Sequence, residues 1–244
     1  MLTLLLTPRR TEDTERMAQA AQGRGLSVVQ PATWSIPALP SEKVLIYGGE
    51  LFLQLACQEL KLPLPVIDPG WLPTLPPALL QRRLIATQLS WARRLSGPIF
   101  VKPIQNKCFA AGVYASGAAL PELPDEEPVY ISEPVHFVRE YRCFLKMGVC
   151  KTGSLYAVEG CPPLEPVSDK GFPAAAQLAE QAWRAVPTLP EGVVIDVGLL
   201  GDGRWAVVEA NPLAESALYG ADAGRVLEML ALVFRYELPS TGFD

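Results

Sequence analysis

The stretch "VVIDVGLLGDGRWAVVEANP", residues 193–212, decides how this chain folds. Two apolar runs flank an Asp202-Gly203 pair, and an Asp-Gly pair in that setting indicates a tight β-hairpin turn. With the turn centred on this pair, Gly201 faces Arg204 across the hairpin. The stretch therefore predicts two antiparallel strands that pair in a fixed register.

This register brings two acidic residues and an amide together. Asp196 falls directly opposite Glu209, and Asn211 shares their face because strand residues two apart point to the same side. Facing side chains have β-carbons about 5 Å apart, so two carboxylates there repel unless a positive group lies between them. Oxygen ligands of this kind suit magnesium, which completes its shell with water and phosphate. The hairpin predicts a magnesium site facing a nucleotide phosphate. The alternative is a solvated strand end with two unrelated acids.

Composition sets the class of protein. The chain has 244 residues, 49% hydrophobic and 19% charged, which is enough for one large domain or for two or three small lobes. No apolar run approaches the roughly 20 residues of a membrane helix. The apolar start "MLTLLLTPRR" is too short for a signal peptide and lacks its basic first part. The net charge of −5 gives no support for broad nucleic-acid binding. We expect a cytoplasmic protein with neither membrane nor nucleic acid as a partner.

Cysteine and histidine usage limits the chemistry. The five cysteines are odd in number and form no C-x-x-C pair, so reduced thiols are expected rather than a zinc site or a disulfide framework. His136 is the single histidine, which excludes a histidine metal cluster. No serine lies in a G-x-S-x-G motif, which argues against a hydrolase triad.

The order of predicted elements divides the chain into three parts. Strands and helices alternate at first, which predicts a small parallel α/β unit. We expect its last strand over residues 63–70, followed by a helix over 76–95 and then several short strands. After Glu133 come antiparallel strands, a helix, the hairpin and a closing helix. The predicted domains are residues 1–75, 76–132 and 133–244.

Three motifs add charges to the predicted site. "PIFVKP" ends a strand on Lys102, where a lysine can hold phosphate as a point charge. "QNKCFAAG" sets Lys107 beside small residues that let backbone N–H groups approach phosphate. "SEPVHFVREYRCFL" places Glu133 before an extended segment that can hold adenine by its backbone, and then Glu140 and Arg142 on one strand face. The alternatives are surface lysines and a structural ion pair.

The order of these motifs resembles the ATP-grasp superfamily. The finer pattern of "EYRCF" and "VVIDVG…GRWAVVEANP" looks like its clade named for two arginines and a lysine, over roughly residues 76–235. The resemblance implies an α/β and α+β protein with the ATP-grasp fold, in which two α+β lobes clasp ATP. A small α/β pre-ATP-grasp domain would precede these lobes.

The resemblance also implies roles for particular residues. The charges at the ATP phosphates and the reaction centre would be Lys102, Lys107 and Arg142. The nucleotide would further contact Arg83, Glu133, Pro134, Val135, His136 and Glu140. In that set the segment from Glu133 to His136 holds adenine and Glu140 holds the ribose. One or two magnesium ions would lie on Asp196, Glu209 and Asn211.

The activity that the resemblance implies is an ATP- and magnesium-dependent ligase. It would join the carboxylate of a small molecule or peptide to an amine through an acyl phosphate. One departure is Val194, which stands where many such ligases carry an arginine. Two alternatives stay open: a kinase-like phosphotransferase on the same site, and a nucleotide-binding module without turnover. Because small ATP-grasp proteins often pair, a homodimer is one expectation for the assembly.

Overall fold

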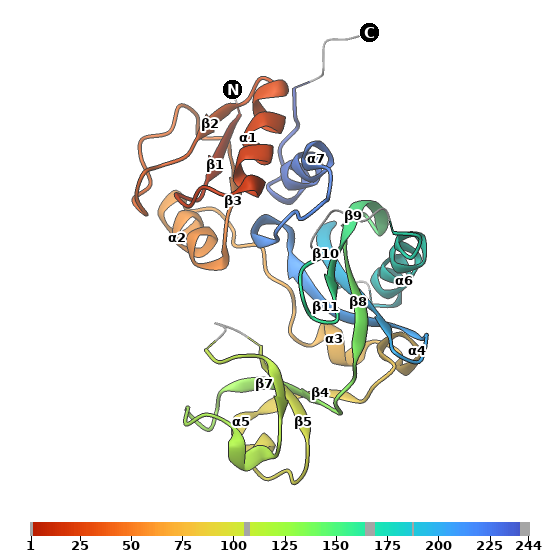
Figure 1. The fold of residues 1–244 in the computed structure, drawn as a ribbon. Coiled ribbons are helices and arrows are strands. Elements are labelled where there is room, and N and C mark those ends of the chain that lie inside the picture. Colours follow the sequence, from red (N-terminus) through yellow and green to blue (C-terminus); the bar gives the residue numbers. More distant parts are fainter. Residues whose placement is uncertain (1, 105–107, 164–168, 187, 240–244) are drawn as a thin grey trace.

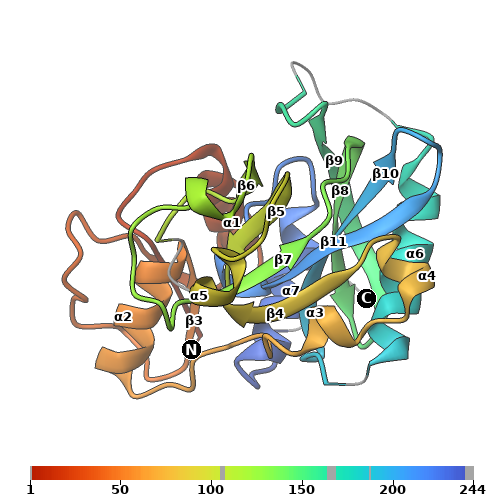
Figure 2. The ribbon, with the colours of Figure 1, turned by 90° about the horizontal axis from the view of Figure 1, so that it is seen from below.

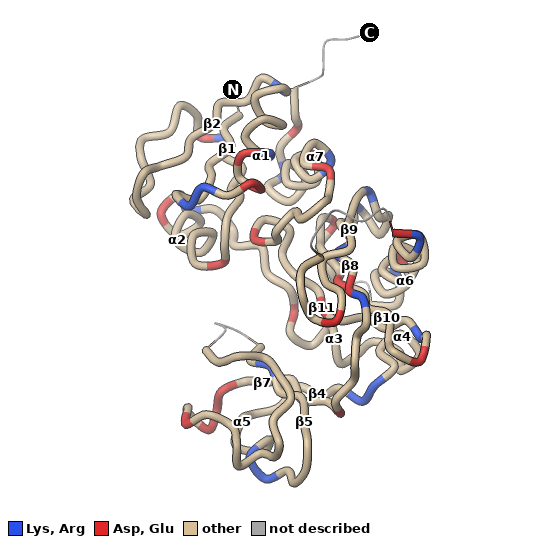
Figure 3. The backbone as a smooth tube through the Cα atoms, in the orientation of Figure 1, with Lys and Arg blue, Asp and Glu red and all other residues tan. Residues whose placement is uncertain are grey.

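The computed structural model describes residues 2–104, 108–163, 169–186 and 188–239. Its strands form three separate sheets, in the orders β2-β1-β3, β4-β7-β5-β6 and β11-β10-β8-β9, and Figure 1 shows them as three successive parts of the molecule. Lysine and arginine residues are scattered over all three parts (Figure 3). Among the described residues, no helix has both the length and the apolar character needed to cross a bilayer.

The first part is a parallel α/β unit, as predicted. It contains β1 (Thr3–Leu6), α1 (Glu12–Gly23), β2 (Ser27–Val29), β3 (Val44–Tyr47) and α2 (Glu50–Leu60). Strand β1 lies in the centre and pairs in parallel with both β2 and β3. Thr11 caps α1, because its hydroxyl accepts a hydrogen bond from the backbone N–H of Thr14.

The last helix of the chain, α7 (Ala223–Val233), packs against this first part. Leu227 and Leu230 of α7 are fully buried in the same core as the leucines of β1, and Figure 1 shows α7 beside α1. The predicted boundaries place α7 with residues 133–244. Its apolar face instead completes the core around the first sheet, so this core is built from both ends of the chain.

The second part is an antiparallel sheet. It contains β4 (Leu84–Gln88), β5 (Ile99–Pro103), β6 (Gly112–Tyr114) and β7 (Pro128–Ser132), with α5 (Leu89–Ala92) and the 3-10 turn η1 (Gly117–Ala119) beside them. Strand β7 pairs with β4 on one side and with β5 on the other. Its own small core gathers around Val101, Val129 and Leu89.

Two expected elements on the way to this sheet are wrong. The helix expected over residues 76–95 stops after α4 (Pro77–Leu80), where Gln81 adopts a left-handed φ of 54°. Residues Leu84–Gln88 then form a strand because they pair with β7. Only one of these five residues is buried, so the sequence does not show the alternation of buried and exposed residues that usually indicates a strand. The strand expected over 63–70 is irregular backbone, since its prolines lack the N–H that a ladder needs, and α3 (Trp71–Thr74) follows it.

The third part is the sheet that carries the predicted hairpin. Its strands are β8 (Phe137–Lys146), β9 (Val149–Val158), β10 (Gly192–Leu200) and β11 (Trp205–Pro212), and the 3-10 turn η2 (Leu213–Glu215) follows β11. Helix α6 (Phe172–Ala185) packs on one face through Ile195, Val197 and Cys143. Residues Val194 and Phe144 point to the other face and join the first core. Figure 2 shows β4 and β7 of the second sheet alongside this third sheet.

Candidate functional site

The hairpin of β10 and β11 sets Asp196 opposite Glu209, which confirms the predicted pair. The register near the turn differs from the prediction by one residue. The Leu200 N–H donates to the Arg204 carbonyl at 2.8 Å, so Gly201 does not face Arg204. A β-bulge next to Asp196 leaves Val208 without a partner on β10. From Asp196 and Glu209 to the far end of the hairpin, the pairing is again the predicted one. The one-residue shift at the turn and the opposite shift at Val208 cancel, so Asp196 still faces Glu209.

Arg82 holds this irregularity in place. Its guanidinium donates to the carbonyls of Val207 at 2.7 Å and Val208 at 3.1 Å, and it lies 5.7 Å above the ring of Phe137. Burial lowers the pKa of Arg82 to about 10, although Glu133 opposes this shift. The sequence pointed to the next residue, Arg83, which is exposed and donates a backbone N–H to Glu133 at 3.2 Å. Two adjacent arginines look alike in sequence, and only the fold distinguishes them.

Replacing Arg82 by methionine is expected to lower the free energy of unfolding by about 2–4 kcal/mol, because the carbonyls of Leu80, Val207 and Val208 lose charge-assisted hydrogen bonds. Methionine keeps much of the packing, so the loss reports mainly on these bonds. Urea unfolding measures it, with Arg83→Met as the matched control that leaves stability nearly unchanged. Equal effects of the two substitutions would contradict the role given to Arg82.

The centre of the site is a buried ion pair between Asp196 and Arg142. The carboxylate is fully buried, and it accepts from Arg142 Nε at 2.9 Å and from Nη2 at 2.7 Å. The two residues face each other on neighbouring strands β10 and β8. Burial disfavours the charge on Arg142, but the contact with Asp196 outweighs it and raises the pKa. In this arrangement the positive group beside Asp196 is a guanidinium.

A second ion pair joins the second and third parts of the molecule. Lys102, at the end of β5, contacts the carboxylate of Glu209 on β11. The side chains are 30% and 22% exposed, so both reach solvent. Asn211 Nδ2 donates to Glu209 at 3.0 Å and to Asp196 at 3.3 Å, which links the two ion pairs. The structure thus brings together Lys102 and the three predicted metal ligands.

Glu140 lies two residues before Arg142 on β8 and belongs to an aromatic cluster. It accepts a hydrogen bond from the Tyr156 hydroxyl at 2.8 Å. The rings of Tyr156 and Tyr219 stack with centroids 5.3 Å apart, and the guanidinium of Arg142 lies 5.3 Å from each ring centre. Tyr156 is a residue that the sequence analysis missed; its place on β9 beside β8 makes it part of the site.

Burial raises the pKa of Glu140, so the native state binds this proton more tightly than the unfolded chain. Ionised Glu140 therefore costs stability, and the cost grows as the pH rises through and above the ordinary carboxyl range. We expect Glu140→Gln to raise the melting temperature at pH 7.5, and the gain to shrink towards pH 4.5. Thermal unfolding at both pH values checks this, with exposed Glu122→Gln as the control. A gain of the same size at both pH values would contradict the assignment.

The predicted adenine segment and Lys102 line different pockets. Pro134, Val135 and His136 line a shallow hollow of about 280 Å³ together with the β10–β11 turn. The His136 carbonyl accepts from the Gly201 N–H at 3.2 Å, and its ring contacts Glu159 at 2.6 Å. Strand β8 leads from this segment past Glu140 to Arg142. The segment is therefore connected through β8 to the ion pair of Arg142 and Asp196, but it does not share a pocket with Lys102 and Glu209.

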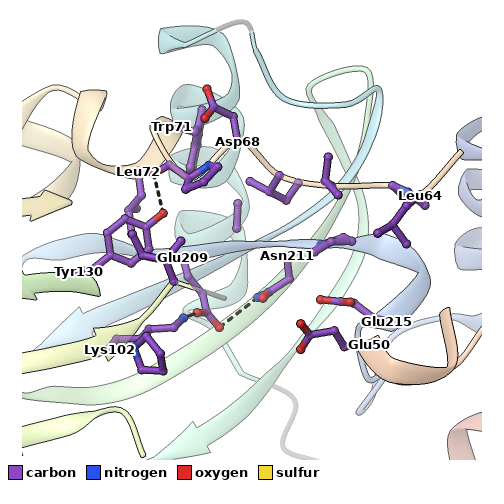
Figure 4. A pocket seen from close by; sticks show the side chains of 18 of the residues that line it. Glu50, Leu64, Asp68, Trp71, Leu72, Lys102, Tyr130, Glu209, Asn211 and Glu215 are labelled. Atoms are coloured by element: carbon purple, nitrogen blue, oxygen red, sulfur yellow. Dashed lines mark hydrogen bonds and ion pairs between the residues drawn. The ribbon is translucent and has the colours of Figure 1, made fainter. Parts of the chain in front are cut away.

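Another pocket, of about 330 Å³, lies beside the ion pair of Lys102 and Glu209 (Figure 4). Lys102, Glu209 and Asn211 are among the residues that line it. Further lining residues come from α2, from the segment 64–72, from the second sheet and the residue after it (Pro103, Ile104 and Tyr130), from β11 and from η2. Tyr130 fixes this segment, because its hydroxyl donates to the Pro69 carbonyl at 2.6 Å. All three parts of the molecule contribute to this pocket.

The donor set is compatible with magnesium at the pocket end of β11. Glu209 is partly exposed, and Asn211 directs its Nδ2 to the two carboxylates, which leaves its amide oxygen for a cation. Asp196 differs, because both of its oxygens accept from Arg142. Among the described residues, no three acidic, cysteine or histidine side chains converge as a metal site. Glu209 and Asn211 therefore fit a magnesium ion better than Asp196 does.

Other residues considered from the sequence have different places. Lys107 lies outside the described residues. Val194 is fully buried in the first core, so an arginine would not fit at that position in this packing. Asp196 lies two residues after Val194 on β10 and on the same face of the sheet, and Arg142 lies opposite Asp196. Arg142 thus supplies a cation close to the place of the missing arginine.

Comparisons with solved structures agree on the fold. The chain is similar to D-cycloserine synthetase DcsG (17% identity, TM-score 0.61), with 94% of this chain and 98% of that chain covered. It is also similar to N5-carboxyaminoimidazole synthetase from Staphylococcus aureus (12% identity, TM-score 0.57, 98% and 78% covered). A third is the ATP-grasp ligase PsnB complexed with minimal precursor, Mg and ADP (11% identity, TM-score 0.51, 95% and 97% covered).

The family comparison adds to this likeness of fold. No curated protein matches the sequence. The ATP-grasp domain family that is family 2 of the clade named for two arginines and a lysine matches residues 79–229. This match spans more than half of the chain and includes both ion pairs. The chain therefore has the ATP-grasp fold and belongs to this family of ATP-grasp domains.

Proposed function

We propose that this protein is an ATP- and magnesium-dependent ligase that joins a carboxylate to an amine. The observation that carries the proposal is the contact between Lys102 and Glu209, which lies at a pocket and joins two lobes of an ATP-grasp fold. Lys102 comes from one lobe and Glu209 from the other. Such a lysine can bind phosphate and such a carboxylate can bind magnesium, so the two suit a magnesium-bound phosphate between the lobes. The similar structures include ATP-grasp ligases, one of them with Mg and ADP.

The proposed reaction has two steps. A carboxylate oxygen of the first substrate attacks the γ-phosphorus of ATP, and the bond from this phosphorus to ADP breaks. The amine nitrogen then attacks the carbonyl carbon of the acyl phosphate, phosphate leaves, and the nitrogen loses a proton. Both steps move negative charge, so the protein contributes mainly position and positive charge.

The residues of this chain divide that work. Lys102 contributes its ammonium group to the ATP phosphates, and Arg142, held by Asp196, supplies positive potential on the same sheet face. Glu209 and Asn211 would hold magnesium, which neutralises charge on the transferred phosphoryl group when bound. Glu140 and the segment 133–136 would hold the ribose and adenine.

An assay of ADP formation tests the proposal. The full chain is incubated with ATP and magnesium and with panels of carboxylates and amines, singly and in pairs. We expect ADP and phosphate to form when a matching pair is present, and mass spectrometry to show the amide product. ADP formation with a stable phosphorylated product and no need for an amine would indicate a phosphotransferase instead. Binding of an ATP analogue with no ADP formation under any pair would indicate a binding module.

A further inference from the structure

We propose that Tyr219 is a positioning residue for Arg142, and that helix α1 fixes Tyr219 by holding the loop of residues 216–222. The loop follows η2 and leads into α7. Neither Tyr219 nor any residue of α1 belongs to the two ion pairs of the site, so both would act through Arg142. This inference rests on the proposed function, because it takes Arg142 as a cation that acts on the ATP phosphates.

Asp196 binds two of the three nitrogens of the Arg142 guanidinium. Nε and Nη2 donate to its carboxylate at 2.9 and 2.7 Å. Among the described residues, Nη1 makes one long hydrogen bond, of 3.5 Å, to the Ala217 carbonyl. The side chain is 11% exposed, so it is largely shielded from water. Nη1 therefore has hydrogen-bonding capacity left for a negatively charged group, provided that the guanidinium is held in place.

Two stacked tyrosine rings contact the same guanidinium. The rings of Tyr156 and Tyr219 are inclined by 22°, with centroids 5.3 Å apart. Arg142 Cζ lies 5.3 Å from each ring centre, within the range of a cation–π contact. Tyr156 belongs to β9 and is fixed by its hydrogen bond to Glu140. Tyr219 is 42% exposed and belongs to the loop, so its ring stays beside Arg142 only if the loop is held.

The backbone of Tyr219 has an unfavourable conformation. Its φ of 50° lies in the left-handed region, which is uncommon for a bulky residue. The next residue, Gly220, approaches β9 closely: its N–H donates to Ser154 Oγ at 3.2 Å, and an added Cβ would lie 3.1 Å from Ser154 Cβ. Conformations of this kind persist only where the surrounding structure fixes them, and they gather at functional sites. The strain at Tyr219 therefore requires firm contacts on both sides of this residue.

Helix α1 supplies such contacts. The guanidinium of Arg16 donates to the carbonyls of Tyr219 and Ala221. The carboxylate of Asp13 accepts from the Leu218 N–H at 2.9 Å. Asp13 and Arg16 are three residues apart and so lie on the same side of the helix. Their hydrogen bonds reach the residue before Tyr219, Tyr219 itself and the second residue after it. The first part of the molecule therefore sets the position of the Tyr219 ring.

Hydrogen exchange of the Arg142 Nε–H group, followed by NMR in the full chain, tests the inference. This group donates to buried Asp196, and its resonance is identified by its loss in Arg142→Lys. Tyr219→Gly suits the left-handed backbone and removes the ring. We expect Tyr219→Gly and Arg16→Met each to speed this exchange about tenfold, the factor expected when a shielded cation–π contact is lost. Tyr219→Phe keeps the ring and should keep the wild-type rate.

Arg24→Met is the matched control, because Arg24 lies at the end of α1 and pairs with Glu228 of α7 instead of the loop. Each variant is also titrated with a non-hydrolysable ATP analogue and with ADP, both with magnesium. We expect the preference for the triphosphate to fall in Tyr219→Gly and Arg16→Met and to persist in Tyr219→Phe and Arg24→Met.

Three results would overturn the role of Tyr219. They are wild-type exchange in Tyr219→Gly or Arg16→Met, an unchanged preference for the triphosphate in these variants, and equal effects of Arg24→Met and Arg16→Met. Failure of the wild type to bind the ATP analogue overturns the proposed function instead. In that case the exchange rates still decide whether Tyr219 and α1 hold Arg142.

Discussion

Replacing Glu209 by glutamine is expected to lower the rate of ADP formation by about 100-fold or more. The substitution keeps the size of the side chain and removes the charge that faces Lys102 and, in the proposed reaction, magnesium. The ion pair is partly exposed, so its loss should change the free energy of unfolding by less than about 1 kcal/mol. A large loss of activity with little loss of stability would identify Glu209 as a functional residue.

The measurement compares magnesium-dependent ADP release and urea unfolding in the wild type, Glu209→Gln and Glu126→Gln. Glu126 is an exposed acid that does not line the pocket, so its substitution should leave both quantities unchanged. Lys102→Met, measured in the same two assays, tests the other residue of this ion pair. Because Lys102 and Glu209 contact each other, the double variant should lose less than the product of the two single losses. Wild-type ADP release by Glu209→Gln would remove this residue from the mechanism.

Asp196→Asn is expected to lower the free energy of unfolding by about 3–5 kcal/mol, since it leaves the buried Arg142 without a counterion. Arg142 is 9% exposed, and Asp196 is fully buried, so neither charge can turn to solvent without disturbing β8 and β10. The loss would be a large fraction of the roughly 5–15 kcal/mol by which native proteins are stable. Urea unfolding of the purified variant measures it.

A double variant separates charge from shape. Asp196→Asn combined with Arg142→Met removes both charges, and we expect it to recover a large part of the stability lost by Asp196→Asn alone. The control is the exposed pair of Asp202 and Arg204, where Asp202→Asn should leave unfolding unchanged. If the double variant still binds an ATP analogue in a magnesium-dependent way, Asp196 is not a required metal ligand. A fully stable Asp196→Asn single variant would contradict the importance of the buried pair.

Much of the candidate site could be predicted because its key signal is local. Asp196 and Glu209 lie on one hairpin, so alternation along two strands and a short turn suffice to pair them. The same locality explains the clustering of Asn211 with both acids. Even here the irregularity at Val208 was not readable, because it depends on Arg82, which comes from a distant segment.

The two wrong elements have different physical causes. Residues Leu84–Gln88 are a strand because they form backbone hydrogen bonds with β7, whose paired residues lie 40–48 positions further along the chain. The helix propensity of their neighbours is a weak local preference that such pairing overrides. The segment 63–70 has strand-like apolar residues but remains irregular, since its prolines cannot donate to a ladder.

The sequence by itself determined the hairpin, the acids on it and the alternation of elements, because these depend on neighbours and on the two-residue period of a strand. Tertiary structure alone decided which cation each acid meets: the order β11-β10-β8-β9 gives Asp196 to Arg142, and the approach of β5 gives Glu209 to Lys102. It also decided the pocket, whose walls come from α2, segment 64–72, β5 and β11. Contacts between such distant segments depend on how whole sheets pack, and no local pattern encodes that packing.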